Sequence, residues 1–461
     1  MEFRVLAIGD VTSEEGTAHL RRHLPGFKKM KGVDFTVING ENISGTGLTP
    51  QQADDLFAAG ADVIIVNTCG FINDAKKESI DKILEMSGYK ESGESEKKLV
   101  VSGCLSERYS KELFDEMPEV DCFIGVNEYE RLPEILRNLH SRKNLVSGCV
   151  GDTLPRMRRK LDGNPFTSTL KIAEGCNNYC AYCVIPSIRG GFRSKKMEDV
   201  LAEAEELAAS GCKELILIAQ DVTNYGIDLY GEYKLPELLR QLCRIDALHW
   251  IRLMYCYEDR ITDELIEVMA AEPKICHYID IPIQHAADPV LRAMNRRSTG
   301  ATIRSTIHRL REAIADIHIR TTLIVGFPGE TEQDFEELLD FVETARLERL
   351  GVFAYSREEG TPAGEMENQI DEAVKEERLD AIMRRQLDIS LAVNQAKIGK
   401  CLEVLVEERD DDGSYVGRTV YDAPEIDNAV LFTSKRDLRA GDFVQVQIND
   451  AFDYDLIGVE V

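Results

Sequence analysis

The sequence has little positive charge and no long hydrophobic run, and both deficits narrow what the protein can be. Of its 461 residues, 55 are Lys or Arg and 82 are Asp or Glu, so the formal net charge is −27. Binding to phosphate backbones depends on Lys and Arg, and we therefore do not expect direct nucleic-acid binding. No apolar run reaches 18 residues, and the amino end MEFRVLAIGD lacks the basic segment of a secretion signal. We expect a cytoplasmic protein with no membrane partner.

A fourth cysteine is missing beside a group of three. Residues 174–190 read EGCNNYCAYCVIPSIRG, which spaces Cys176, Cys180 and Cys183 as C-x3-C-x2-C. A structural zinc site closes its tetrahedron with four ligands, which usually come from separated C-x2-C pairs. Three thiolates on one loop instead suit a [4Fe–4S] cluster that keeps one iron open. In a reducing compartment, clustered cysteines are also better candidates for metal ligands than for disulfides.

The open iron predicts a particular chemistry. S-adenosylmethionine can chelate such an iron, and an electron from the cluster then breaks a carbon–sulfur bond to give a 5′-deoxyadenosyl radical. The cysteine spacing, with Tyr182 before the last cysteine, resembles the signature of radical S-adenosylmethionine enzymes. The protein's part in such a reaction is to align cluster, sulfonium and substrate carbon and to exclude water.

Alternating strand and helix patterns predict an α/β fold over residues 165–390. Helical patterns such as 197–210 and 332–347 separate six apolar, β-branched runs. The runs are STLKIA (168–173), ELILIA (214–219), HWIRLMY (249–255), HYIDIPI (277–283), IRTTLIVGF (319–327) and LGVFAY (350–355). This spacing implies parallel βα units with right-handed crossovers, and six of them make an open, partial (βα)6 barrel.

Polar residues cluster directly after these strands, at the edge where parallel barrels build their active sites. They are Gln220, Asp221, Tyr255, Tyr257, Gln284 and His285, with the ranges 326–330 and 356–361. From position alone, four side chains are candidates for contacting S-adenosylmethionine: Gln220, Arg252, Gln284 and His285. Ordinary loop chemistry is an equal alternative for any single pair.

A smaller α/β unit is predicted before the barrel, over residues 61–150. Two of its buried strands, in ADVIIVNTCGF and KKLVVSGCL, each end with a cysteine, Cys69 and Cys104. Thiols at equivalent strand ends suggest a shared site, with isolated core or loop cysteines as the alternative. Residues 151–167 are predicted to be a linker.

A small all-β module is predicted at the carboxyl end, over residues 397–461. The charged, Ala- and Leu-rich segment 370–396 predicts a long helix that ends the large barrel. After Gly399 the pattern switches to short strands broken by DDDG and DAPEIDN, which predicts an antiparallel β-barrel. This module holds fifteen acidic and seven basic residues, so it is itself acidic.

Several stretches between residues 61 and 461 resemble one known family. VNTCGFINDAKKESIDKILE, EGCNNYCAYCVIPSIRGGFRSK, IPIQHAADPVLRAMNRRST, IVGFPGETEQDFEELLDF and GRTVYDAPEIDNAV look like the RimO family of ribosomal-protein methylthiotransferases. The resemblance implies a methylthiotransferase-type (MTTase) amino-terminal domain, a radical barrel and a carboxy-terminal TRAM module. It also implies methylthiolation of the β-carbon of an aspartate in the basic small ribosomal subunit protein twelve, which the acidic TRAM module would attract.

The same resemblance implies roles for five cysteines. Cys176, Cys180 and Cys183 would bind the radical-generating [4Fe–4S] cluster. Cys69 and Cys104 match two of the three ligands of an auxiliary [4Fe–4S] cluster, which presents or supplies the sulfur. One S-adenosylmethionine would donate the methyl group and a second would form the radical, with an electron from a separate donor.

The amino end departs from this family, because no cysteine precedes Cys69 to supply the third auxiliary ligand. Residues 1–64 instead resemble the start of the YmdB-like binuclear metallophosphoesterases, whose metal ligands match Asp10, Glu41 and Asn42. Oxygen ligands at strand ends suit hard divalent ions. The later histidine ligands of that family nevertheless have no counterpart here.

Two further cysteines could complete the auxiliary site. Cys122 or Cys149 could take the missing place, or Asp10 could act as an oxygen ligand. Otherwise the cluster would be labile or absent, and the radical half could still cleave S-adenosylmethionine without transferring sulfur.

Four other functions remain open at this point. The first is a transfer-RNA adenosine methylthiotransferase, the activity most similar to that of the RimO family. It is disfavoured by the stretches IPSIRGGF and DAPEID and by the acidic module. The second is an uncoupled radical enzyme that makes 5′-deoxyadenosine but no methylthio product. A non-catalytic iron–sulfur or ribosome-binding protein and a residual metal-dependent phosphoesterase complete the set.

Overall fold

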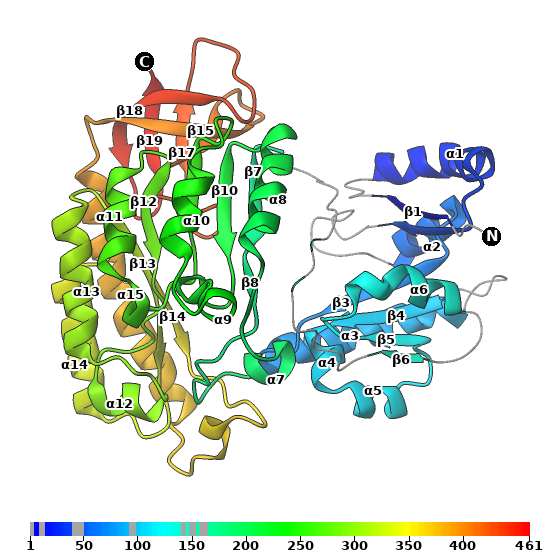
Figure 1. Cartoon of the computed structure of the whole chain (residues 1–461), viewed down its shortest axis with the longest axis horizontal. Helices are drawn as coiled ribbons and strands as arrows, with labels where there is room; N and C mark the ends of the chain where they lie inside the picture. Colours follow the sequence, from blue (N-terminus) through cyan, green and yellow to red (C-terminus); the bar gives the residue numbers. More distant parts are fainter. Residues whose placement is uncertain are drawn as a thin grey trace. The chain divides into compact units, whose positions relative to one another are not determined.

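The computed structural model describes residues 4–8, 14–38, 50–91, 98–139, 144–146, 154, 156 and 165–461. It divides into two compact units, which Figure 1 colours from blue to red along the chain. The first unit is drawn from the residues up to 152 together with Val184–Gly190, and the second is centred on Asn164–Cys183 and Gly191–Val461. In this described part, no helix is both long and apolar enough to span a membrane.

The first unit is built on short parallel strands. Strand β1 (Val5–Ile8) pairs with β2 (Phe35–Ile38), and a second sheet has the order β3 (Val63–Thr68), β4 (Lys98–Gly103), β5 (Cys122–Ile124) and β6 (Asn144–Val146). The helices are α1 (Glu14–Lys31), α2 (Pro50–Ala59), α3 (Asn73–Glu91), α4 (Cys104–Arg108), α5 (Ser110–Glu116) and α6 (Leu132–Asn138). Successive residues of β4 are fully buried because apolar side chains cover both faces of the sheet, as parallel sheets require. The predicted α/β character of this region is confirmed.

The second unit contains the predicted partial barrel. Six strands form one parallel sheet in the order β14-β13-β12-β11-β10-β7. Their bounds are β7 (Thr167–Lys171), β10 (Glu214–Ile218), β11 (Trp250–Leu253), β12 (Ile275–Asp280), β13 (His318–Val325) and β14 (Arg349–Ala354). All six predicted strands are confirmed, in the predicted parallel arrangement.

Helices connect the strands of this sheet and surround it (Figure 1). They are α8 (Met197–Ala209), α9 (Ile227–Tyr230), α10 (Leu235–Leu242), α11 (Asp263–Ala271), α12 (Asp288–Ala293), α13 (Gly300–Ala313), α14 (Glu332–Ala345) and α15 (Glu372–Gln395). Helices α13 and α14 begin with capping boxes, in which Thr299 and Thr331 accept from backbone N–H groups of the first turn. The long predicted helix that ends the barrel is α15.

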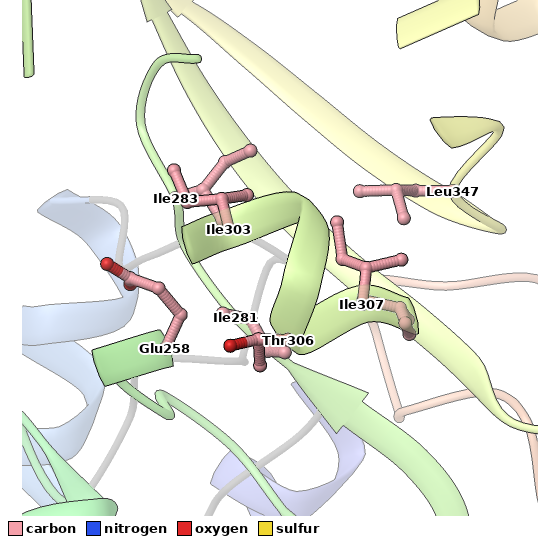
Figure 2. Close-up of a pocket in the computed structure, with 8 residues that line it drawn as sticks. Glu258, Ile281, Ile283, Ile303, Thr306, Ile307 and Leu347 are labelled. Atoms are coloured by element: carbon pink, nitrogen blue, oxygen red, sulfur yellow. The ribbon is translucent and has the colours of Figure 1, made fainter. Parts of the chain in front are cut away.

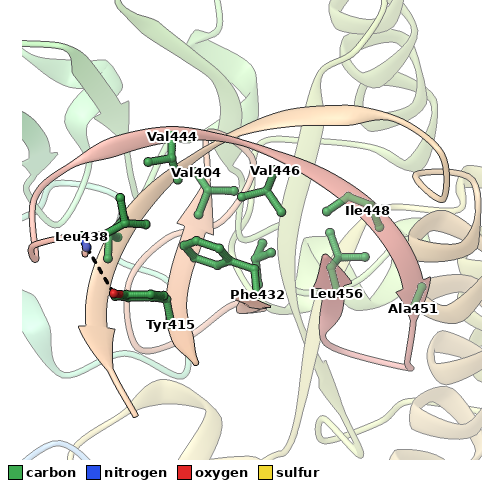
Figure 3. Close-up of a cluster of buried hydrophobic side chains, with 11 residues drawn as sticks. Val404, Tyr415, Phe432, Leu438, Val444, Val446, Ile448, Ala451 and Leu456 are labelled. Atoms are coloured by element: carbon green, nitrogen blue, oxygen red, sulfur yellow. Dashed lines mark hydrogen bonds between the residues drawn. The ribbon is translucent and has the colours of Figure 1, made fainter. Parts of the chain in front are cut away.

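The carboxyl end folds into a closed five-stranded barrel. Its strands are β15 (Cys401–Arg409), β16 (Tyr415–Thr419), β17 (Val430–Thr433), β18 (Phe443–Ala451) and β19 (Leu456–Glu460), in the order β15-β16-β17-β19-β18. Figure 3 shows its interior filled by aliphatic side chains around Tyr415 and Phe432, with the Tyr415 hydroxyl accepting from the Leu438 N–H at 3.1 Å.

The expectation of a purely antiparallel barrel was wrong in one pairing. Strands β17 and β19 are parallel, whereas the other four neighbouring pairs are antiparallel. Around a closed ring of five strands, directions cannot alternate throughout, so at least one neighbouring pair must be parallel. The barrel is therefore mixed.

This small barrel packs on the amino-terminal ends of the large sheet's strands. The buried carboxylate of Glu214, the first residue of β10, accepts from Arg252 at 2.8 Å and from Arg418 of the small barrel. Asp422 accepts from Arg349, the first residue of β14, at 2.6 Å. Asp427 accepts from the Tyr278 hydroxyl at 2.6 Å. Asp422 and Asp427, the first and last residues of the DAPEID motif, thus form contacts within the protein, between the small barrel and the large sheet.

A buried histidine at this junction predicts acid sensitivity. The His318 ring stacks on Tyr421 with centroids 4.1 Å apart, and burial, aided by Lys397 and Arg349, lowers the pKa of His318 to about 3. The unfolded chain binds a proton near pH 6.5 and the folded chain does not. As the pH falls from about 6.5 to about 3, this histidine should therefore lower the free energy of unfolding by about 1.4 kcal/mol per pH unit.

The variant His318→Phe keeps an aromatic ring on Tyr421 and removes the titration. We expect its melting temperature to drop less than that of the parent protein between pH 7 and pH 5, measured by differential scanning calorimetry. His308→Phe, at an exposed position on α13, is the control and should leave the pH dependence unchanged. Equal pH dependence in the parent protein and His318→Phe would contradict the assignment.

Candidate functional site

The loop of Cys176, Cys180 and Cys183 follows β7 and the short strand β8 (Ala173–Glu174), at the carboxyl edge of the large sheet. The Cys180 side chain is buried and the other two cysteines are half-buried. Gly175 and Tyr179 have φ angles of 79° and 50°, so the loop turns sharply on both sides of Cys176. Helix α7 (Ile185–Arg189) and strand β9 (Arg193–Ser194) follow.

A buried carboxylate at the next strand end fixes this loop. Asp221 follows β10 and accepts from Asn178 at 3.0 Å, from Arg260 at 2.6 Å and from Thr223 at 2.6 Å. Arg260 also donates to the Asn178 side-chain oxygen at 2.8 Å, which closes a triangle of hydrogen bonds. The ends of β10 and β11 therefore hold the loop between its first two cysteines.

The backbone of the loop is tied to three further positions on the rim. The Gly175 N–H donates to the Gln220 side chain at 2.7 Å, and Asn295 donates to the Tyr179 carbonyl at 2.8 Å. The Ala181 N–H donates to the Met294 carbonyl at 2.9 Å. These hydrogen bonds fix the backbone that carries the three thiols.

Two predicted rim residues, Gln284 and His285, stand just beyond β12. Gln284 has a φ of 70°, and its side-chain oxygen is buried with no hydrogen-bond partner among the described residues. The fully buried His285 accepts from the Ala287 N–H at 3.0 Å, and burial lowers the pKa of His285 to about 3. The imidazole is therefore neutral near pH 7, and its Nε2 lies 3.9 Å from Glu330.

The fourth candidate for contacting S-adenosylmethionine, Arg252, does not lie at the rim beside the cysteine loop. Its guanidinium, fully buried, donates to Glu214 at 2.8 Å and to the Val420 carbonyl at 2.9 Å, at the end of the sheet that faces the small barrel. The sequence places Arg252 on a strand but does not show which end of the barrel its long side chain reaches. The structure does not bring it together with the other three candidates, and we no longer assign it to the site.

In the first unit, Cys69 and Cys104 are neighbours at one sheet edge. The parallel register of β3 and β4 pairs Thr68 with Gly103, so the residue after each strand is one of the two cysteines. A side chain at Gly103 would meet the Thr68 carbonyl oxygen at 2.3 Å, and Gly103 also has a φ of 104°. The two strands can approach this closely only because of the glycine.

A cation lies against the Cys104 sulfur. Arg189 of α7, which belongs to the same unit, donates from Nη2 to the Cys104 sulfur at 3.4 Å. Val184 and Ile188 pack with Val126 beside Cys104. Cys69 is exposed and Cys104 is half-buried, so both sulfurs can be reached.

Of the candidates for a third ligand of the auxiliary cluster, the structure describes Cys122. Cys122 begins β5 and pairs in register with Val100, near the start of the neighbouring strand rather than its cysteine-bearing end. It is fully buried, and burial raises the pKa of Cys122 to about 12, which makes it a poor thiolate ligand. The two other candidates, Cys149 and Asp10, lie outside the described residues, as do Glu41 and Asn42 of the metallophosphoesterase-like ligand set.

The donor set fits iron–sulfur clusters. Among the described residues, no three His, Cys, Asp or Glu side chains gather closely enough to hold a single metal ion. A [4Fe–4S] cluster binds each thiolate through a different iron, so its ligands stand farther apart than those of one ion. Three anchored thiols on one short loop meet that requirement.

Comparisons with known proteins agree with this chemistry. A family model described as the radical SAM superfamily matches residues 170–342, one described as the TRAM domain matches 398–461, and one described as uncharacterized protein family UPF0004 matches 41–125. "Ribosomal protein uS12 methylthiotransferase RimO" of Desulforamulus reducens is 52% identical over 408 residues, covering 87% of this chain and 91% of that protein. The protein of the same name in Geobacter sulfurreducens is 50% identical, covering 86% and 90%. The chain belongs to the RimO family.

Solved structures support the fold of this RimO-family chain. TsrM from Kitasatospora setae, a radical S-adenosylmethionine methyltransferase, superposes with a TM-score of 0.55 at 13% identity, covering 79% of this chain and 74% of that one. The cobalamin-dependent radical enzyme OxsB gives 0.52 at 13% identity, covering 83% and 56%. S-adenosylmethionine and iron–sulfur chemistry follow from membership of the radical SAM superfamily. The UPF0004 match begins at residue 41, earlier than the boundary at 61 that we predicted.

Sequence reasoning missed three residues that shape the cysteine loop. Asn178 and Arg260 form the triangle with Asp221, and the Tyr257 hydroxyl lies 3.3 Å from the Cys180 sulfur. Tyr257 was recognised only as a polar residue after a strand. Nothing in the spacing of Arg260 distinguishes it from a solvated surface arginine.

Proposed function

We propose that this protein adds a methylthio group to the β-carbon of an aspartate in ribosomal protein uS12. The observation that carries the proposal is the cysteine loop, whose three thiols are anchored at the carboxyl edge of a six-stranded parallel sheet. The relatives that share about half of its residues carry the name of that activity.

The cysteine loop is the proposed radical site. Cys176, Cys180 and Cys183 would hold a [4Fe–4S] cluster, which with S-adenosylmethionine supplies a 5′-deoxyadenosyl radical able to abstract an unactivated hydrogen. Asp221, through Asn178 and Arg260, keeps the loop in place during the reaction.

The rim beside the loop offers groups for a bound substrate or cofactor. In this proposal the Gln284 side-chain oxygen, which has no hydrogen-bond partner among the described residues, would accept a hydrogen bond from S-adenosylmethionine, and the neutral His285 would add no charge to this rim. Gln220 acts indirectly, by holding the Gly175 N–H. In this proposal a separate electron donor reduces the radical cluster by one electron.

Cys69 and Cys104 are the proposed ligands of a second, auxiliary [4Fe–4S] cluster that carries the sulfur. Their adjacency at one sheet edge and the cation of Arg189 at the Cys104 sulfur support that role. The guanidinium of Arg189 can donate to a thiolate sulfur, and the thiolate is the form of cysteine that binds iron. This cluster would be held by residues of the amino-terminal domain (61–150), whereas the radical cluster would be held by residues of the radical barrel (165–390).

The TRAM module (397–461) is the proposed docking surface for the basic ribosomal protein. Its turn Asp410–Asp412 is exposed, and so is Asp437 on the same module. Two of its fifteen acids, Asp422 and Asp427, are buried against the large sheet and take no part in attraction. Surface charge of one sign accelerates encounter with an oppositely charged partner and is screened by salt.

Neutralising two exposed acids should weaken this association. For Asp410→Asn with Asp411→Asn, we expect a several-fold slower association with purified uS12 at low salt, and a weaker dependence of the rate on salt. Biolayer interferometry at several salt concentrations measures both. The matched control is Glu336→Gln with Glu337→Gln, which removes the same charge from an exposed face of α14. Equal effects of the two double variants would remove the TRAM module from the proposal.

Mass spectrometry of uS12 tests the proposed reaction. Anaerobically reconstituted enzyme, S-adenosylmethionine, a reductant and ribosomal small subunits should yield a methylthio adduct on one aspartate. An adduct on transfer RNA with unmodified uS12 would assign the chain to the rival substrate. Formation of 5′-deoxyadenosine without any adduct would identify an uncoupled radical enzyme and overturn the proposal.

A further inference from the structure

A tyrosine from outside the cysteine loop touches the most buried of its three sulfurs. The Tyr257 hydroxyl lies 3.3 Å from the Cys180 Sγ, and Tyr257 follows β11, whereas the loop follows β7. We propose that Tyr257 is a positioning residue that donates a hydrogen bond to the cluster-bound Cys180 sulfur and thereby raises the reduction potential of the radical cluster. This inference rests on the proposed role of Cys180 as a cluster ligand.

The direction of the hydrogen bond follows from the chemistry of the ligand. In the free thiol either atom can be the donor. A cysteine that binds iron does so as a thiolate, which has no proton to donate. The tyrosine side chain carries an O–H at neutral pH, so it must be the donor.

Several contacts fix the tyrosine where it can make this bond. Its backbone N–H donates to the Thr223 hydroxyl at 3.1 Å. The guanidinium of Arg296 lies 4.2 Å from the ring centroid and that of Arg260 lies 5.1 Å away, both within the range of cation–π attraction. The ring is thus held by the same Arg260 that anchors the loop through Asp221.

Arg296 is itself held by a buried carboxylate. Its Nη2 donates to Glu258 at 2.7 Å, and both side chains are almost fully buried. Figure 2 shows Glu258 at the edge of a mostly apolar pocket lined by Ile281, Ile283 and Ile303. In such surroundings the pair has no competing partner from solvent, so the guanidinium stays against the tyrosine ring.

A hydrogen bond to a cluster sulfur affects the two oxidation states differently. Reduction adds one negative charge to the cluster and its sulfurs, and a donor stabilises the more negative state. Removing the donor should therefore lower the reduction potential. For Tyr257→Phe we expect about a tenfold smaller equilibrium constant for reduction, which for one electron corresponds to about 59 mV.

Redox titration of the reconstituted full-length protein tests this directly. The electron paramagnetic resonance signal of the reduced radical cluster is followed against ambient potential in the parent protein and in Tyr257→Phe, both carrying Cys69→Ala and Cys104→Ala to simplify the spectrum. We expect a more negative midpoint in Tyr257→Phe. Tyr278→Phe is the control, because it removes another buried tyrosine hydroxyl, that on Asp427, and should leave the midpoint unchanged.

A second readout does not depend on the potential. In deuterated water, electron–nuclear double resonance of the reduced cluster should show exchangeable hydrogens coupled to it. Tyr257→Phe should lose the coupling of the Tyr257 hydroxyl, whereas that of the Tyr182 hydroxyl, which also bonds Cys180, should remain. An unchanged midpoint together with an unchanged coupling would overturn the inference while leaving the proposed function intact. If instead Cys180→Ala retained the full iron content, Cys180 would not be a ligand and the proposed function itself would fail.

Discussion

Cys180→Ala should lose about four irons per chain and all formation of 5′-deoxyadenosine. Each cysteine of the loop would hold one iron of the cluster, and a [4Fe–4S] cluster that lacks one of three protein ligands is not retained on a single loop. Cys180 is the buried member of the set, so no outside thiol can readily replace it. Iron and sulfide analysis after anaerobic reconstitution, with chromatography of the nucleoside product, measures both effects.

Another cysteine provides the control for that experiment. Cys401 is exposed at the start of β15 in the small barrel, far along the chain from either cysteine site. Cys401→Ala should keep the full iron content and the full rate of 5′-deoxyadenosine formation. If Cys180→Ala behaved like Cys401→Ala, the three-cysteine loop would not be the radical site.

Glu214→Ala should destabilise the second unit by about 3–5 kcal/mol, the range observed when one partner of a buried ion pair is removed. Burial alone would raise the pKa of Glu214, but the guanidiniums of Arg252 and Arg418 hold it below its ordinary value. Removing the carboxylate leaves two buried cations facing each other at the junction of the large sheet and the small barrel. Loss of this anchor should expose the small barrel to early unfolding.

Thermal unfolding and limited proteolysis would record this change. We expect a large fall in melting temperature and faster cleavage within residues 397–461. Asp437→Ala is the matched control, because Asp437 pairs with Arg409 at 2.9 Å on the exposed surface of the same barrel. Exposed pairs contribute little, so its effect should stay within about 0.5 kcal/mol. Similar effects of the two variants would show that the buried network does not hold the module.

Most of the fold could be predicted from the sequence because its strands are clear runs of apolar residues. The run ELILIA is fully apolar at its centre and became a buried parallel strand, as did HYIDIPI. Likewise, C-x3-C-x2-C predicted a loop of three sulfurs because spacing along one loop is a local property. The mixed pairing of the small barrel follows from ring closure, which strand patterns alone do not show.

The positions reached by long side chains could not be predicted from the sequence. Arg252 was predicted at the reactive rim, yet its guanidinium reaches Glu214 at the opposite end of the strands. The DAPEID segment was interpreted as a break between strands and as a feature of the RimO family. The structure shows in addition that Asp422 and Asp427 join the module to the sheet. The contact of Tyr257 with Cys180 joins loops that follow two different strands, and the direction in which each loop side chain points is set only when the chain is folded.

One measurement tests the central claim most directly. The parent protein, loaded with iron and sulfide without oxygen and then reduced, is given S-adenosylmethionine alone, and the nucleoside product is identified by mass spectrometry. A protein that holds an open-cornered iron–sulfur cluster on Cys176, Cys180 and Cys183 will produce 5′-deoxyadenosine. Iron-loaded, reduced protein that leaves S-adenosylmethionine intact would contradict the account.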